Sequence, residues 1–283
     1  MALTLSITNH RSDIVGLKYI YPVLSRRAGG LSIGINFNTN NACNWRCIYC
    51  QVPDLITGSA PALDFALLEQ ELRGFLQQVL HGDFYDVFQV PPEQRVIKDI
   101  AIAGNGEPTS LKEFAEAVGL IGRIATELGV LPQSKFVLIS NGSLIHLPKV
   151  QDGLRALHRY GGEVWFKLDS ADDSRRKLIN NSVQSTAAAL ANMRIASGLC
   201  TTKIQTCVFE YQQQGWSLSE QQAYLDALNS IKNDTAIEQV MLYTLARTSA
   251  QPEAGGLEKC SAADLEALAD KVRALGFSVS VSL

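Results

Sequence analysis

Short apolar segments alternate with segments of helical periodicity along this chain, and this alternation limits the possible folds more than any other feature. The segment VIKDIAIAG at 96–104 is almost continuously apolar, as is typical of a parallel strand that is buried on both faces. By its pattern and its high content of β-forming residues, the sequence predicts strands at 31–37, 96–104, 135–140, 163–169, 203–210 and 238–245.

Apolar residues at helical spacing separate the predicted strands. Between the first two strands, for example, Leu68, Leu72 and Leu76 fall on one face of a helix. Ser110, with Glu113 three residues later, predicts the capped start of the helix after the second strand. Further helices are expected at 148–159, 183–197, 217–232 and 261–275, the first helix spans 63–80, and SVSVS at 278–282 indicates a short extra strand.

Strand–helix alternation of this kind predicts an α/β fold, in which a parallel sheet has helices outside it. Six such units are compatible with an open doubly wound sheet or with a partial barrel, and periodicity alone does not choose between them. In both architectures the loops at the carboxyl ends of the strands carry the chemistry. We expect residues 31–283 to form one domain and residues 1–30 to be an N-terminal extension packed on it.

The composition argues against several classes of protein. No run of about 18 apolar residues is present in the 283-residue chain, so a transmembrane helix is not expected. The start, MALTLSITNH, also lacks the features of a secretory signal, and together these observations predict a cytoplasmic protein with no membrane partner. Nucleic-acid-binding proteins usually carry a basic surplus, whereas the net charge here is −3, so a nucleic-acid partner is not favoured.

Three of the six cysteines lie within eight residues, in the loop after the first predicted strand. Cys43, Cys47 and Cys50 have the spacing C-x3-C-x2-C, which lets three thiols converge on one metal centre. A structural zinc site normally needs four ligands, and no second pair of cysteines is visible. A four-iron cluster bound by three cysteines keeps one iron open, which is typical of a reactive site rather than an electron carrier. We therefore predict that these thiols bind a [4Fe–4S] cluster.

This cysteine segment, with Tyr49 before the last cysteine, resembles the signature of the radical S-adenosylmethionine (SAM) superfamily. The resemblance implies a partial (β/α)6 barrel of parallel strands and two cofactors, a [4Fe–4S] cluster and SAM. It also implies that an electron from a carrier such as flavodoxin or ferredoxin cleaves SAM to methionine and a 5′-deoxyadenosyl radical, which abstracts hydrogen from a substrate. Tyr49 would lie against the adenine, and packing within the loop is the alternative role of its ring.

A second motif with a counterpart in the superfamily follows the second predicted strand. It consists of Gly104, Asn105, Gly106, Glu107 and Pro108. The run resembles the Gly-Gly-Glu-Pro segment whose backbone and glutamate hold the ammonium group of SAM. A dinucleotide-binding loop would instead need G-x-G-x-x-G, and position 109 is threonine.

Polar residues also close the third and fourth predicted strands. Ser140 and Asn141 end the third strand, and Lys167 and Asp169 end the fourth. By resemblance, these groups bind the ribose and carboxylate of SAM. The residues themselves leave alternatives open, because Asn141 is followed by glycine, as in a simple turn. Lys167 and Asp169 share one face of a strand and are equally compatible with a structural ion pair.

Four segments are similar to a narrower branch of the superfamily, the wyosine-base-forming tRNA enzymes and their uncharacterised bacterial Fe–S oxidoreductase relatives. They are SIGIN at 32–36, CIYCQ at 47–51, GEPT at 106–109 and YTLAR at 243–247. The additional cysteines and basic elements that the wyosine enzymes use for their substrate have no visible counterpart. We therefore predict a small-molecule or peptide substrate. A tRNA-modifying enzyme and a non-enzymatic iron–sulfur protein are the alternatives.

Basic residues outside the motifs give two further expectations. Arg26 and Arg27 in the N-terminal extension, and Arg247 at the end of the last predicted strand, are candidate anchors for the substrate. The run Arg175-Arg176-Lys177 is expected to be a solvated surface group, as most short charge clusters are.

The remaining cysteines form no C-x2-C pair, so a second cluster is not predicted. Cys200 and Cys207 are expected in the core, where cysteine behaves as a small hydrophobic residue. Cys260 lies in a glycine-rich loop before a predicted helix and is a candidate reactive thiol.

Overall fold

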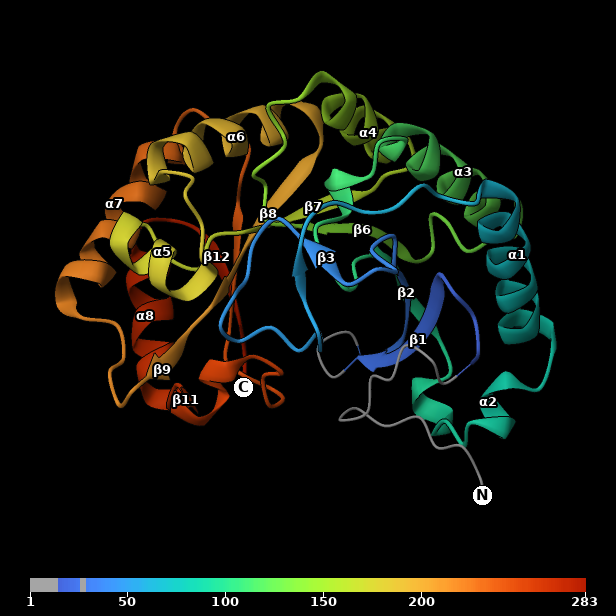
Figure 1. The fold of residues 1–283 in the computed structure, drawn as a ribbon, viewed down its shortest axis with the longest axis horizontal. Coiled ribbons are helices and arrows are strands. Elements are labelled where there is room, and N and C mark those ends of the chain that lie inside the picture. The colour runs from blue at the N-terminus through green and yellow to red at the C-terminus, as the bar shows by residue number, and fades with distance from the viewer. Residues whose placement is uncertain (1–14, 26–28) are drawn as a thin grey trace.

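The computed structural model describes residues 15–25 and 29–283. Among these residues, eight strands form one curved sheet (Figure 1), in the order β1-β2-β5-β6-β7-β8-β10-β12. Their bounds are β1 Ile20–Ser25, β2 Gly30–Ile35, β5 Ile97–Ile102, β6 Lys135–Ser140, β7 Glu163–Lys167, β8 Thr201–Cys207, β10 Gln239–Tyr243 and β12 Ser278–Ser282. Neighbouring strands from β2 to β12 are parallel, and β1 runs antiparallel to β2 at one edge.

Helices cover the convex side of this sheet, as Figure 1 shows. The α-helices are α1 Phe65–His81, α2 Phe84–Val87, α3 Phe114–Glu127, α4 Pro148–Arg159, α5 Asp173–Asn180, α6 Thr186–Leu199, α7 Leu218–Lys232 and α8 Ala262–Ala274. Three short 3-10 helices are η1 Pro92–Gln94, η2 Pro108–Ser110 and η3 Pro252–Gly256. Two small sheets pair β3 Ala42–Cys43 with β4 Ile56–Thr57, and β9 Phe209–Tyr211 with β11 Leu257–Lys259.

The two faces of the curved sheet differ in chemistry because alternate residues of a strand point to opposite sides. The convex face carries residues such as Ile33, Ile100 and Phe136, which are at most 1% exposed and pack in the main core with the helices. The concave face carries charged residues instead, among them Glu163 and Lys203, whose side chains form an ion pair of 2.6 Å. The strands therefore bury one face in the core and present a polar wall on the other.

The predicted partial (β/α)6 barrel is confirmed. Strands β2, β5, β6, β7, β8 and β10 each lead into a helix of the outer layer, in the order of the sequence. An open doubly wound sheet would have helices on both faces, and here the helices lie on the convex side of a curved sheet. The segment SVSVS forms β12, which extends the sheet in parallel beside β10.

The start predicted for the helix after the second predicted strand, which is α3, is wrong. Ser110 does not cap it, because Ser110 belongs to η2, and α3 begins at Phe114 after Glu113. The Ser110 hydroxyl instead donates to the carbonyl of Glu107 and accepts from the amide of Ala60. The elements that were not predicted include β1 and α5.

Residues 20–25 of the predicted N-terminal extension belong to the main sheet as β1. Residues 1–14 and 26–28 lie outside the described residues, and with them the predicted anchors Arg26 and Arg27. The division of the chain into an extension at 1–30 and a barrel at 31–283 therefore stays a prediction.

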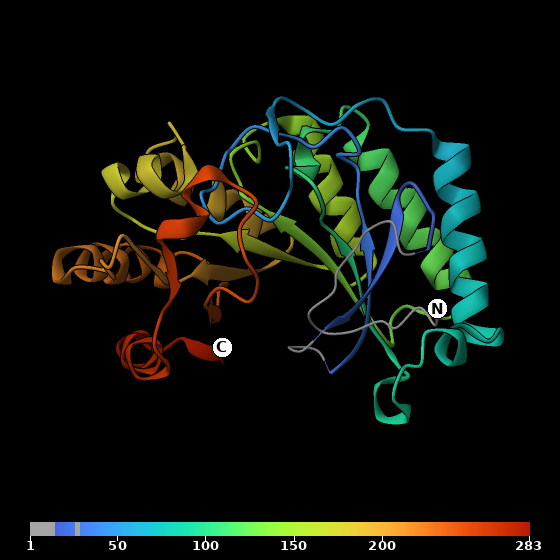
Figure 2. The same ribbon diagram turned by 60° about the horizontal axis from the view of Figure 1, so that its bottom comes forward.

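The loops at the carboxyl ends of the parallel strands lie together at one rim of the sheet. Figure 2 shows the segment after β2, in blue, beside α5 and beside the segment that contains η3. Backbone hydrogen bonds join these parts, for example from the amide of Ala250 to the carbonyl of Cys50 at 2.9 Å. In the described part of the chain, no helix is long and apolar enough to cross a membrane.

Candidate functional site

The loop that carries the three cysteines, residues 38–58, is held at both ends by short backbone pairings. Asn38 at its start donates from Nδ2 to the carbonyl of Ala42 at 2.8 Å, and β3 pairs with β4. Asn41 adopts a left-handed conformation with φ 54°, which asparagine tolerates better than most residues. The backbone amide of Ala42, the next residue, donates to Asn40 Oδ1 at 3.2 Å. We call this segment the cysteine loop.

Helix α5 fixes the middle of the cysteine loop. The amides of Arg46 and Ile48 donate to the carbonyls of Asn180 and Ile179, at 3.2 and 2.8 Å. These two carbonyls lie in the last turn of α5, where helical partners run out. On the opposite side, Arg46 forms a two-pronged ion pair with Glu253 at 2.7 and 2.9 Å. The loop thus bridges α5 and η3.

The three thiols of this loop are free, and each is partly exposed. N–H groups approach all three sulfur atoms: Trp45 N lies 3.4 Å from Cys43 Sγ, Asn180 Nδ2 lies 3.3 Å from Cys47 Sγ, and backbone amides at Gln51 and Val52 bond Cys50. Burial nevertheless raises the pKa of Cys43 to about 12 and that of Cys47 to about 11. A bound cation is therefore needed to hold these groups as thiolates at neutral pH.

Iron–sulfur clusters are commonly stabilised by N–H groups that donate to the cysteine sulfur atoms, so this set of donors fits such a cluster. Within the described residues, no three His, Cys, Asp or Glu side chains are arranged to bind a single metal ion.

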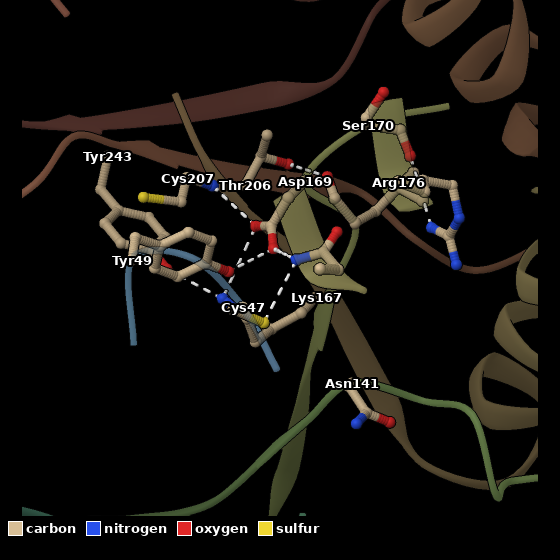
Figure 3. Close-up of polar contacts among 12 residues, drawn as sticks. Cys47, Tyr49, Asn141, Lys167, Asp169, Ser170, Arg176, Thr206, Cys207 and Tyr243 are labelled. Atoms are coloured by element: carbon tan, nitrogen blue, oxygen red, sulfur yellow. Dashed lines mark hydrogen bonds and ion pairs between the residues drawn. The ribbon is translucent and has the colours of Figure 1, made fainter. Parts of the chain in front are cut away.

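A buried carboxylate beneath the cysteine loop connects it to the sheet. Asp169, whose side chain has no exposed surface, accepts hydrogen bonds from the hydroxyl of Tyr49, from Asn180 Nδ2 at 2.9 Å and from the backbone amide of Cys207 at 3.0 Å. The Lys167 ammonium lies 3.5 Å from the same carboxylate. Figure 3 shows these groups converging on Asp169. The end of β7, the cysteine loop, α5 and β8 thus meet at one side chain.

The aromatic residue of the motif is part of this connection. The ring of Tyr49 packs at 5.2 Å from that of Phe209, and burial raises the pKa of its phenol well above the usual value. Its hydroxyl is already bonded to Asp169. Packing within the loop, the alternative left open by the sequence, is therefore present, and an adenine contact stays a prediction.

The Gly104–Pro108 segment packs directly against the cysteine loop. A Cβ atom at Gly106 would lie 2.0 Å from the carbonyl oxygen of Ala42, so only glycine allows this approach. Gly104 has a φ of 149°, a conformation that side chains rarely adopt. Asn105 then donates from Nδ2 to Asn41 Oδ1 at 2.7 Å. The two loops therefore form one unit.

Glu107 links this unit to the end of β6. Its buried carboxylate accepts from the amide and hydroxyl of Thr109, from Ser140 Oγ at 2.7 Å and from the amide of Asn141 at 2.8 Å. Burial raises the pKa of Glu107 in spite of these hydrogen bonds. One oxygen, Oε2, has a single donor among the described residues, so it retains capacity for another.

Asn141 continues the chain of contacts toward the cysteines. It donates from Nδ2 to Asn44 Oδ1 at 2.9 Å, and Asn44 in turn donates to Ser143 Oγ at 2.8 Å. All the predicted site residues are thus brought together at the rim of the sheet. Their contacts with SAM stay predictions.

Sequence reasoning missed two residues that build this site. Asn180 contacts both Cys47 and Asp169, and it lies in α5, which was not predicted. Arg176 was expected in solvent with its neighbours, and this was wrong, because Arg176 is 1% exposed and Arg175 is 7% exposed. The guanidinium of Arg176 lies 5.5 Å from the ring of Trp45 in the cysteine loop. A periodic burial signal is too weak in this short polar helix to reveal either role.

The three remaining cysteines are all buried. Cys200 and Cys207 lie in the core as predicted. Cys260 is 9% exposed, and burial raises its pKa to about 11, which disfavours the reactive thiolate that its position suggested. Arg247, the predicted anchor, is exposed; burial raises the pKa of Tyr21 on β1 to about 12, and the charge of Arg247 partly opposes this rise.

Comparison with known proteins agrees with this geometry. The model of the radical SAM superfamily matches residues 37–213, which include the cysteine loop, both glycines of the second motif and the end of β7. The chain belongs to the radical SAM superfamily. Proteins of this superfamily are enzymes that use a [4Fe–4S] cluster and SAM, so the alternative of a non-enzymatic iron–sulfur protein is set aside.

Individual relatives of this radical SAM enzyme are distant. A UPF0026 protein of Helicobacter pylori is 30% identical over 155 residues, which are 53% of this chain and 42% of that protein. The chain thus spans less than half the length of this curated relative.

Two solved structures share the fold. A radical SAM methyltransferase from Sphaerobacter thermophilus is 14% identical, with a TM-score of 0.60 over 93% of this chain and 68% of that one. The structure of TYW1 with a lysine-pyruvate adduct bound is 15% identical, with a TM-score of 0.56 over 87% of this chain and 74% of that one. TYW1 is a wyosine-forming enzyme, and at 15% identity this likeness shows the shared fold alone.

Replacing Glu107 by Gln tests the second motif. We expect cluster-loaded E107Q to bind SAM more weakly by about 1.5–3 kcal/mol, the usual value of a lost charge-assisted hydrogen bond. Anaerobic equilibrium dialysis with labelled SAM measures this change. Ser140→Ala is the matched control, because it removes a donor to Glu107 but keeps the carboxylate, and its effect on affinity should be smaller. Equal affinity in E107Q and wild type would remove Glu107 from the SAM site.

Proposed function

We propose that this protein binds a [4Fe–4S] cluster through Cys43, Cys47 and Cys50, binds SAM at the open iron, and abstracts hydrogen from a compact substrate. The observation that carries the proposal is the cysteine loop itself, where three free thiols with N–H donors at their sulfur atoms lie at the rim of a half-barrel. When bound, the reduced cluster supplies the electron that splits SAM into methionine and a 5′-deoxyadenosyl radical. That electron requires a partner, for which a flavodoxin or ferredoxin is our choice.

The protein's own residues would divide the work of binding SAM. Glu107 has acceptor capacity left at Oε2, which suits the ammonium group of SAM, and Gly104 and Asn105 bring backbone beside it. Ser140 and Asn141 hold Glu107 in place from the next strand. In this proposal, these contacts hold the Glu107 carboxylate in position to accept from the ammonium group of SAM.

Lys167, Asp169 and Tyr49 have a different role in this proposal. Their polar atoms already bond one another or Tyr243, whose hydroxyl lies 2.9 Å from the Lys167 ammonium. A carboxylate with three donors and an adjacent ammonium has little capacity left for a ribose. We therefore assign these three residues to holding the cysteine loop rather than to SAM.

The concave wall of the sheet supports a compact substrate. Its residues include Trp165, whose indole nitrogen donates to Glu163 at 2.7 Å, and Lys203 on the next strand. Trp165 and Lys203 lie in central strands of the sheet, and both side chains are half-buried. These groups lie near the starts of the strands, away from the cysteine loop, and as paired charges they give a folded RNA no surplus of basic charge to bind, so we favour a small polar molecule or a peptide.

The metal ligands are tested by iron loading. After anaerobic reconstitution, wild-type protein should hold about four irons and four sulfides, the composition of the cluster. Cys43→Ala, Cys47→Ala and Cys50→Ala should each lose the broad absorbance of the cluster and the reductive cleavage of SAM. Cys260→Ala is the control, because this buried thiol lies outside the loop, and it should load fully.

Two results would contradict the proposal. The first is full iron loading in any of the three loop variants. The second is a wild-type protein that binds one zinc in tetrahedral thiolate coordination instead of iron.

The alternative is a tRNA substrate, because the sequence resembles the wyosine-base-forming tRNA enzymes and TYW1 shares the fold. Because the net charge is −3, we expect no submicromolar binding of tRNA at about 150 mM salt. A filter-binding assay over a range of salt concentrations measures this affinity. Submicromolar binding that falls steeply with salt would replace the compact substrate by tRNA.

A further inference from the structure

Two opposite charges lie side by side at the end of β7, beneath the cysteine loop. The Lys167 ammonium is 3.5 Å from Asp169, and it also lies 5.1 and 5.6 Å from the ring centres of Tyr49 and Tyr243. Its side chain is 16% exposed. Figure 3 shows that it points toward the same cluster of atoms as Asp169. A lysine enclosed in this way is not free to reach a substrate in the concave wall.

Asp169 holds the cysteine loop in place, but it also puts a negative charge near the proposed cluster. A single side chain, Asn180, separates its carboxylate from a cluster ligand, since Nδ2 of Asn180 donates both to Asp169 and to Cys47 Sγ. A negative charge at this distance opposes the addition of an electron to a cluster on Cys47.

Lys167 acts in the opposite direction. Its ammonium borders Asp169 on one side and the ring of Tyr49, the residue before Cys50, on the other. Tyr49 directly precedes Cys50 in the chain, and Asn180 joins Asp169 to Cys47, so the ammonium lies close to two of the three proposed ligands. Another concave lysine with a close carboxylate, Lys203, pairs with Glu163 at the far end of the strands from the cysteine loop.

We propose that Lys167 sets the reduction potential of the cluster, by cancelling the charge of the Asp169 carboxylate that holds the cysteine loop. The inference rests on the proposed function, because it needs a cluster on Cys43, Cys47 and Cys50. In the reaction concerned, an external one-electron donor is oxidised and the cluster is reduced, with no bond formed or broken in the protein. The lysine stabilises the reduced state because that state carries one more negative charge.

The test is a redox titration of reconstituted protein, followed by the EPR signal of the reduced cluster. In Lys167→Met we expect the ratio of reduced to oxidised cluster at a fixed potential to fall about tenfold, which is 59 mV for one electron. Lys167→Arg keeps the charge and should restore most of the wild-type ratio. Lys203→Met is the matched control, since it removes a paired lysine from the same wall, and its titration should follow wild type.

Asp169→Asn should shift the reduction potential of the cluster in the opposite direction, to a higher value. It removes the negative charge but keeps an oxygen that can accept from Tyr49 or Cys207, so its cluster should be easier to reduce than wild type. A role in packing alone would not produce shifts of opposite sign in the two variants. Iron analysis of each variant accompanies the titration.

Each outcome bears on one claim. If wild type holds no cluster, the proposed function fails. If wild type and K167M bind equal amounts of iron and their clusters have the same reduction potential, the inference about Lys167 is wrong and the proposed function stands. If Lys167→Met and a second variant, Lys167→Gln, lose the cluster while unfolding at the wild-type temperature, Lys167 has a role in assembly and the inference is also wrong.

Discussion

The buried carboxylate of Asp169 is the interaction on which the architecture of this site depends. It joins β7, the cysteine loop, α5 and β8 through hydrogen bonds from Tyr49, Asn180 and the amide of Cys207. A buried charge is tolerated only when it is paired and hydrogen-bonded, and Lys167 completes that requirement. Removing one member of such a network usually costs more than forming it gained, so these residues act as a unit. The position of the cysteines is therefore determined by the sheet beneath them as well as by the loop.

A second constraint comes from the thiols. Burial raises the pKa of Cys43 and Cys47 well above neutral pH, so in the absence of metal they carry protons. Metal binding must release those protons, so cluster assembly depends on pH. The N–H donors at each sulfur favour the thiolate form that binds the metal. The rim of the half-barrel supplies these donors from the cysteine loop itself and from Asn180 of α5.

The sequence was sufficient to predict the sheet and its helices, because buried parallel strands such as β5 and β6 are nearly continuous apolar runs. It missed β1, since Pro22 interrupts the strand pattern and proline is tolerated mainly at a sheet edge, where β1 lies. It also missed α5, an eight-residue helix that is largely polar, with Arg176 buried by contacts that no local pattern reveals.

For the site, the spacing of the cysteines and the positions of polar residues at strand ends were enough to predict which residues lie together at one rim of the sheet. They could not assign roles, because the role of Lys167 or Tyr49 depends on partners that lie 76 and 120 positions away in the sequence. The sequence therefore left two alternatives open for each of them. The contacts of the structural alternative are present in both cases, and the contacts with SAM stay predictions.

The central claim is that three thiolates hold a cluster whose fourth iron is open to SAM. Electron–nuclear double resonance of the reduced protein, with SAM labelled by ¹⁵N in its amino group, tests that claim most directly. The account predicts a hyperfine coupling between the label and the cluster that vanishes when unlabelled SAM is used. A cluster spectrum that SAM does not alter, with no coupling to the label, would contradict it.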